Sequence, residues 1–140
     1  MRHRNHSKRL ARKPAQSRLI LKNLVTSVIL YESVRTTKKR AQVARSIVDR
    51  VITIGKTKRP DLAIRQINLV VADENACRKI LEVLKTRYAK RSSGFTRMIP
   101  VGQRQGDGAL LVDLALVDSA EPVVAAEEKK TPAKKSPSKK

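Results

Sequence analysis

At 140 residues, 40% of them hydrophobic, the chain has enough apolar material for one modest domain. Its 32 Lys and Arg against 12 Asp and Glu give a formal charge of +20. Because so many positive charges repel one another, the composition predicts a polyanionic partner. A single cysteine, Cys77, excludes an internal disulfide framework, and no apolar run is long enough for a signal peptide or a membrane span, so we expect a cytoplasmic protein without membrane insertion.

Aromatic side chains are scarce, because Tyr31, Tyr88 and Phe95 are the only ones. Modules that bind single-stranded nucleic acid splay its bases over several aromatic faces. The shortage favours a folded RNA that is held through the geometry and charge of its phosphates.

Residues 1–14 are predicted to form an extended basic arm that becomes ordered only against its partner. They show no hydrophobic period, end at Pro14, and open a stretch of 31 residues that contains no acidic side chain. From about Ala15 to Tyr31, apolar residues recur at helical spacing and predict a first helix. These residues are Ile20, Leu21, Leu24, Val25, Val28 and Ile29.

The β-branched run Ser33–Thr37 predicts a strand, and Thr37 is a candidate cap for the helix that follows. That helix is marked by an apolar stripe and is expected to end at Gly55, before a basic turn that reaches Arg59. The stripe consists of Ala41, Ala44, Ile47, Val48, Val51 and Ile52.

Two more helices are predicted in the middle of the chain. Pro60 is expected to begin a short helix that reaches about Leu69, and Asp73 to cap a longer helix that reaches Tyr88. The apolar face of the longer helix consists of Cys77, Ile80, Leu81, Leu84 and Tyr88.

After Tyr88 the hydrophobic period changes to two and predicts an antiparallel hairpin. Its strands are Phe95–Val101 and Ala109–Val117, joined by the glycine-rich residues 102–108. Pro100 lacks a backbone donor and favours an edge strand, and Asp113 is expected to face solvent or RNA. The side chains expected to face the helices are Leu110, Val112, Leu114 and Leu116. Residues 119–140, rich in Pro, Ala and Lys, are predicted to be a disordered tail, which leaves 15–118 as the globular domain.

The residues that might support catalysis or metal binding do not form a recognisable site. The sequence around Gly55-Lys56-Thr57 has Arg50 where a phosphate-binding loop needs a glycine. His3 and His6 with Cys77 lack a fourth zinc ligand, and no nucleophile has a base near it in sequence. We therefore expect no enzyme, no cofactor, no metal site and no small-molecule substrate.

Three basic clusters carry the functional signal: the arm, Arg35–Arg40, and Lys85–Arg104, which contains no acid. The cations that begin the second helix oppose its dipole unless an anion lies nearby, which favours a bound phosphate. From charge alone, the candidate RNA contacts are Arg4, Lys8, Arg9, Lys13, Arg18, Lys22, Arg35, Lys38, Lys39 and Arg91.

A succession of short motifs resembles the bacterial large-subunit ribosomal protein family numbered seventeen, from Met1 to about Asp118. In order, the motifs are Met1-Arg2-His3 with Leu10 and Arg12, Asn23-Leu24, Thr36-Thr37, Arg40-Ala41, Ile52-Thr53, Arg87-Tyr88, Gly94-Phe95-Thr96-Arg97, Arg104, Gly106-Asp107 and Leu116-Val117-Asp118. Each motif is weak alone, but the collinear succession is specific.

The resemblance implies a fold, a location and a set of contacts. The fold is a two-layer α+β domain in the order helix, strand, three helices, two strands, which agrees with the periodicities. The location is the large ribosomal subunit near the exit of the peptide tunnel, beside large-subunit rRNA of the 23S type and neighbouring proteins that include large-subunit protein thirty-two. Carried over by position, the RNA contacts are Arg2, His3, Arg12, Thr36, Thr37, Arg40, Arg97 and Arg104.

Two other functions remain as alternatives. The lysine-rich end, Pro132–Lys140, also suits a histone-like protein that compacts DNA. An RNA-modifying enzyme with an unrecognised site is the other alternative, although no catalytic cluster supports it.

Overall fold

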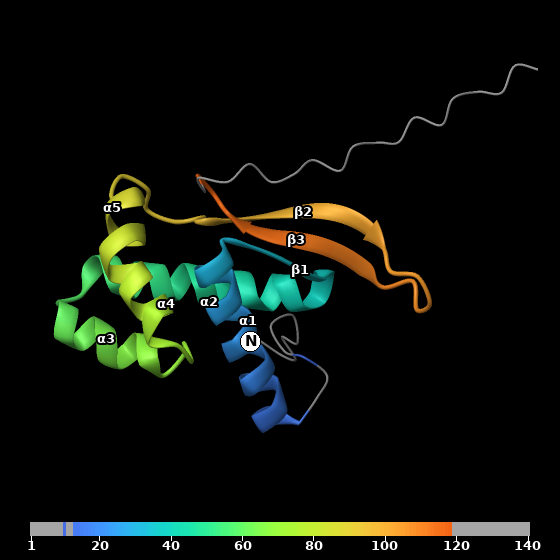
Figure 1. Ribbon diagram of the computed structural model, residues 1–140, viewed down its shortest axis with the longest axis horizontal. Helices are drawn as coiled ribbons and strands as arrows, with labels where there is room; N and C mark the ends of the chain where they lie inside the picture. Colours follow the sequence, from blue (N-terminus) through green and yellow to red (C-terminus); the bar gives the residue numbers. More distant parts are fainter. Residues whose placement is uncertain (1–9, 11–12, 119–140) are drawn as a thin grey trace, which may run out of the picture.

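The computed structural model describes Leu10 and residues 13–118. The expectations for most of the basic arm and for the disordered tail concern residues 1–9, 11–12 and 119–140, which lie outside the described residues. The elements are α1 (Pro14–Tyr31), β1 (Ser33–Thr37), α2 (Lys38–Thr57), α3 (Pro60–Asn68), α4 (Glu74–Lys79), the π-helical segment η1 (Ile80–Leu84), α5 (Lys85–Arg87), β2 (Thr96–Gln103) and β3 (Leu110–Leu116) (Figure 1). This order confirms the predicted α+β domain.

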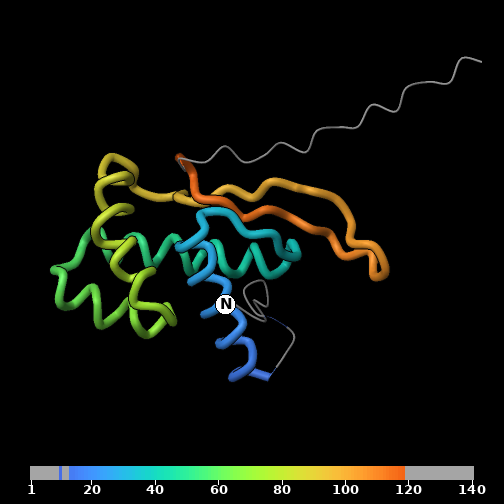
Figure 2. The backbone as a smooth tube through the Cα atoms, in the orientation of Figure 1, coloured from blue at the N-terminus to red at the C-terminus, as the bar shows by residue number. Residues whose placement is uncertain are grey.

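Among the described residues the strands form one antiparallel sheet in the order β1-β3-β2. The predicted hairpin is therefore confirmed, and Pro100 does lie in an edge strand. Helices α1 and α2 pack against one face of the sheet, and none of the described helices lies on its other face (Figure 1). The hairpin continues past the end of β1, because Thr37 pairs with Leu111 while Leu110 pairs only with Gln103 (Figure 2).

Helix α1 begins one residue earlier than the sequence predicts. Pro14 is the first helical residue and not the end of the arm, which suits proline because its missing N–H would have no partner in a first turn. The helix stops at Glu32, whose φ of 62° is left-handed. That reversal leads directly into β1, and Leu116 N–H donates to the carbonyl of Glu32.

The expected end of the second helix at Gly55 is wrong, because α2 continues to Thr57 and Gly55 is buried inside it. A Cβ at Gly55 would lie 2.7 Å from Cγ2 of Ile80, so this glycine allows two helical segments to pack closely. Thr37 occupies the N-cap position as predicted, but its side chain makes no capping hydrogen bond.

The single long helix predicted from Asp73 to Tyr88 is also wrong in part. Asp73 does cap it, accepting the backbone N–H of Asn75 at 2.9 Å. The helix then changes to π-helical geometry at Ile80, the residue that packs against Gly55, and returns to α geometry at Lys85. Such short π segments are accommodated inside α-helices where packing requires a local change of pitch.

The core is aliphatic and lies between the sheet and the helices. Tyr88 and Phe95 add the two buried rings, with centroids 5.1 Å apart, and Cys77 is a buried core residue as expected. Val112, Leu114 and Leu116 are buried as predicted. Leu110 is half-exposed, because it lies in the part of the hairpin that extends beyond β1.

Candidate nucleic-acid interface

The helix-free side of the sheet, called here the outer sheet face, carries alternate residues of each strand. Val112 and Leu114 of β3 enter the core, so Asp113 and its neighbour Ala115 point the other way. Arg35 of β1 is opposite Asp113, and Arg97 of β2 is opposite Ala115. The sheet therefore brings one cation from the second basic cluster and one from the third onto a single surface.

Arg35 is neutralised within that surface. Its Nε donates to Oδ1 of Asp113 at 2.9 Å and its Nη2 to Oδ2 at 3.2 Å. Asp113 points away from the helices as expected, but its side chain is only 14% exposed and faces a guanidinium. The hydrogen bonds to Asp113 raise the pKa of Arg35.

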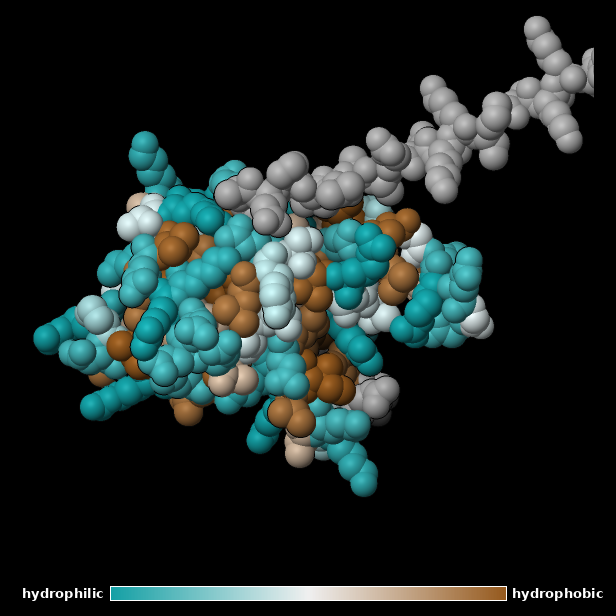
Figure 3. Space-filling view, viewed as in Figure 1, coloured by the Kyte–Doolittle hydropathy of each residue, from teal (hydrophilic) through white to brown (hydrophobic). Residues whose placement is uncertain are grey.

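Arg97 differs from the other two predicted contacts of the third cluster. Its side chain is exposed and makes no hydrogen bond or ion pair with any described residue. By contrast, Arg91 pairs with Asp118 at 3.3 Å. Arg104 pairs with Asp107 at the tip of the hairpin, and the hydrogen bond from Arg104 lowers the pKa of Asp107 to about 2. Hydrophilic side chains cover this tip (Figure 3).

The predicted cationic start of the second helix is confirmed. Lys38, Lys39 and Arg40 form the first turn of α2, which contains no acidic residue, directly after Thr36 and Thr37 of β1. Since the helix N-terminus is itself positive, the three cations add to its field. The turn attracts anions strongly.

The first turn of α2 also lies against the hairpin. Lys38 lines an apolar groove of about 370 Å³ together with Met98, Pro100, Leu110 and Val112. The groove lies on the helix side of the hairpin, because Met98, Pro100 and Val112 point that way, whereas Arg97 of β2 is on the outer sheet face.

The cations of α1 lie elsewhere. Arg18 and Lys22 belong to the first half of the helix and Lys13 is its N-cap residue; this end of the helix points away from the sheet (Figure 1). The structure does not bring these three residues together with Arg35 or Arg97. The predicted contacts in the arm, Arg2, His3, Arg4, Lys8, Arg9 and Arg12, lie outside the described residues.

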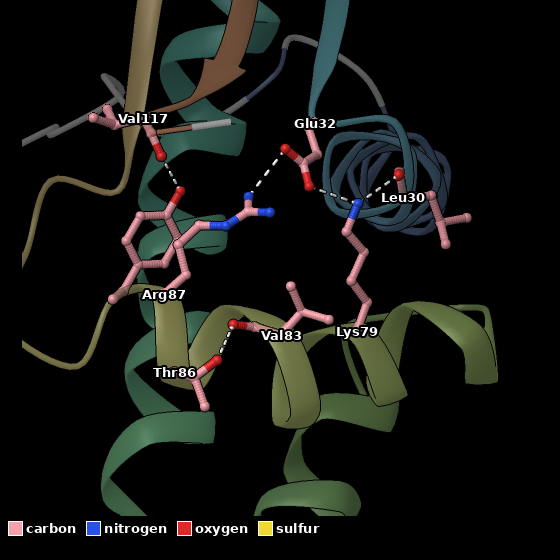
Figure 4. Close-up of polar contacts among 8 residues, drawn as sticks. Leu30, Glu32, Lys79, Val83, Thr86, Arg87 and Val117 are labelled. Atoms are coloured by element: carbon pink, nitrogen blue, oxygen red, sulfur yellow. Dashed lines mark hydrogen bonds and ion pairs between the residues drawn. The ribbon is translucent and has the colours of Figure 1, made fainter. Parts of the chain in front are cut away.

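A cluster around Glu32 positions the sheet and was not predicted. Its carboxylate lies between Nζ of Lys79, at 2.9 Å, and Nη1 of Arg87, at 3.0 Å (Figure 4). Burial alone would raise the pKa of Glu32, but hydrogen bonds from Arg87 and Lys79 hold it below its usual range. The cluster ties the end of α1 to α4 and α5. The only sequence signal for it was that Glu32 is the first acid in the chain.

Two further contacts hold the strands that carry the interface. Tyr88 donates its hydroxyl hydrogen to the carbonyl of Val117 at the end of β3 (Figure 4). Asp49 of α2 accepts the backbone N–H of Phe95 at 3.1 Å, two residues before Arg97. Burial raises the pKa of Asp49, although the Phe95 N–H and Arg45 oppose that rise. Sequence reasoning gave Asp49 no role, because its partner is distant in sequence.

The described part of the chain lacks two further features. No group of three His, Cys, Asp or Glu side chains there is placed to hold a metal ion. Of the helices at 13–118, none is long and apolar enough to cross a membrane.

Comparison with known proteins identifies the family. Residues 20–117 match the family described as ribosomal protein L17. Relatives named large ribosomal subunit protein bL17 include the protein of Syntrophotalea carbinolica, 40% identical over 119 residues, which are 84% of this chain and 76% of the relative. That of Caldanaerobacter subterraneus subsp. tengcongensis is 40% identical over 111 residues, 79% of this chain and 97% of the relative. That of Geotalea daltonii is 38% identical over 138 residues, 98% of this chain and 74% of the relative. The resemblance in the sequence motifs is thereby confirmed, and the chain belongs to the ribosomal protein L17 family.

Proposed function

We propose that this chain is a structural constituent of the large ribosomal subunit that binds and stabilises large-subunit rRNA. The names of its relatives support the place in the large subunit, and with it a cytoplasmic location. Membership of a family of structural ribosomal proteins agrees with the expectation of no enzymatic activity. The role in translation is then to help the rRNA keep its fold.

The observation that supports rRNA binding most directly is the state of the cations around the hairpin. Arg97 is exposed and has no partner among the described residues, while the first turn of α2 holds three cations without an acid. Phosphates fixed at the spacing of a folded RNA would neutralise both sets. The proposed contacts around the hairpin and the start of α2 are Thr36, Thr37, Lys38, Lys39, Arg40 and Arg97. Arg35, Arg91 and Arg104 are proposed as weaker contacts, because a phosphate would have to compete with their carboxylate partners.

Other parts of the proposal depend on the sequence and on the resemblance. The arm, with Arg2, His3, Arg4, Lys8, Arg9, Arg12 and Lys13, is proposed to bind further rRNA segments because of its acid-free charge. The position near the tunnel exit and the contact with large-subunit protein thirty-two follow from the resemblance. Arg18 and Lys22 lie at a different surface, beside Leu19 and Leu69.

Substitution of Arg97 tests the rRNA contact. In binding of the chain to large-subunit rRNA at increasing salt, Arg97→Gln should lower the slope of log affinity against log salt by about 0.7–0.9, the loss of one phosphate contact. Arg78→Gln is the matched control, because Arg78 is also exposed but pairs with Glu74 on α4. Equal slopes for the wild type and Arg97→Gln would contradict the contact.

Sedimentation of a cell lysate tests the ribosomal assignment as a whole. We expect the chain in the large-subunit fraction after a wash in moderate salt. Recovery with nucleoid DNA, and not with large subunits, would support the histone-like alternative and overturn the proposal.

A further inference from the structure

A groove between α1, α2 and the end of α3 is lined in part by exposed leucines that lie outside the core. It measures about 480 Å³, within the usual range of binding pockets. Leu19 of α1 and Leu69 at the end of α3 are 60% and 80% exposed, and Leu21 and Ile47 lie with them in the lining. Exposed apolar surface that gathers in one hollow is typical of an interaction site, whereas single exposed leucines are not.

The groove is bordered by cations. Arg18, Lys22 and Arg50 line it, and none of the other described residues in its lining is Asp or Glu. None of the three has a carboxylate partner among the described residues. An occupant with negative charge beside apolar groups would therefore match the groove.

The apolar lining favours a protein over RNA as that occupant. Phosphates would neutralise the three cations but would leave Leu19 and Leu69 against a polar backbone. An unstacked base would find no aromatic face there, because none of the lining residues at 13–118 is aromatic. Aliphatic side chains with carboxylates next to them satisfy both parts of the surface, and Arg is common where protein interfaces form.

We propose that this groove docks a short segment of a neighbouring protein in the assembled large subunit. The segment inserts aliphatic side chains between Leu19 and Leu69 and places carboxylates against Arg50 and the neighbouring Arg18 and Lys22. The proposal rests on the proposed function, because it assumes assembly into the subunit. Arg18 and Lys22 were predicted to contact RNA because of their charge alone. The proposal assigns them to a protein interface instead.

Photocrosslinking in intact large subunits tests the occupant. The chain with benzoylphenylalanine in place of Leu69 is incorporated into large subunits, and the subunits are irradiated. The crosslinked product is then mapped by mass spectrometry. We expect one protein segment that carries aliphatic and acidic residues. A link to rRNA, a link to residues 119–140 of this chain, or no link would each overturn the proposal.

Leu62 is the matched control for position. It is another exposed leucine of α3, but it does not line the groove. Benzoylphenylalanine at Leu62 should not give the Leu69 product, and the same product from both positions would overturn the assignment to the groove. The same label at Arg97 should link to rRNA, which reports on the proposed function separately.

Charge exchange tests the proposed ion pairs. Arg50→Glu should lower the yield of the Leu69 crosslink by about twofold to fivefold, the effect of losing a solvent-exposed pair. Replacing a mapped carboxylate of the partner with Lys should restore that yield. An unchanged yield in Arg50→Glu, or a loss that the partner change does not restore, would overturn the pairing.

Discussion

Arg35 and Asp113 form a two-point ion pair across β1 and β3 on the outer sheet face, although they are 78 residues apart in sequence. The pair places a carboxylate in the middle of a surface whose other charged side chains on the strands, Arg35 and Arg97, are cationic. Arg35 is therefore neutralised before any RNA arrives, while Arg97 on the other side of β3 is not.

Removing that carboxylate should strengthen the surface as a phosphate binder. We expect Asp113→Asn to steepen the salt dependence of rRNA binding by about 0.7–0.9 in log–log slope, because Arg35 becomes available for one phosphate. Stability should change by only about 0–1 kcal/mol, since the guanidinium is mostly exposed.

Asp61→Asn controls for the change in total charge. Asp61 is exposed in the first turn of α3 and has no ion pair with any described residue. An equal change of slope in both variants would show that net charge, and not Arg35, causes the effect.

Glu32→Gln should destabilise the fold by about 1.5–3 kcal/mol, because Lys79 and Arg87 lose their charged acceptor. Glutamine keeps the length of the side chain, so packing is preserved. Urea unfolding measures the loss. Glu82→Gln, an exposed change on η1, should stay within about 0.5 kcal/mol; similar losses in both variants would contradict the role of the cluster.

The same variant should alter the acid sensitivity of the protein. The pKa of Glu32 is lower in the folded chain than its ordinary value of 4.5, so the unfolded state binds more protons in that range. The stabilisation from Glu32 is thus complete above pH 4.5 and is lost as the pH falls through the lower folded pKa. Urea unfolding across this range should show a smaller decline in Glu32→Gln than in the wild type; parallel declines would be inconsistent with the lowered pKa.

Gly55→Ala should destabilise the protein by about 1–3 kcal/mol, although alanine favours a helix by about 1 kcal/mol. The new Cβ would lie 2.7 Å from Cγ2 of Ile80. Ile80→Leu removes that atom, so the double variant should cost less than the sum of the two single changes. Thermal melting of all four proteins measures the coupling, and additive costs would refute the close approach.

Deletion of residues 119–140 should leave the melting temperature of the domain unchanged. The composition of this segment predicts that it contributes no core, and the described core ends with β3. A fall of about 4 °C or more, which corresponds to roughly 1 kcal/mol, would contradict its assignment as a disordered tail.

The sequence alone was enough for the order of the elements and much of the core. Hydrophobic periods of 3.6 and 2 residues, with local signals such as Asp73 and Pro60, depend on neighbours within one turn or one strand. For that reason the helices, the hairpin and the burial of Cys77 could be predicted. The family resemblance likewise needed only the collinear order of short motifs.

Tertiary structure alone decided which charges are neutralised and which glycine is a packing residue. Arg35 and Arg97 look alike in sequence, but strand register places only Arg35 beside Asp113. The sequence predicted that a helix ends at Gly55, whereas the structure shows that Ile80 packs against this glycine inside the helix. Such contacts join residues far apart along the chain, so they depend on how whole elements pack and not on local spacing.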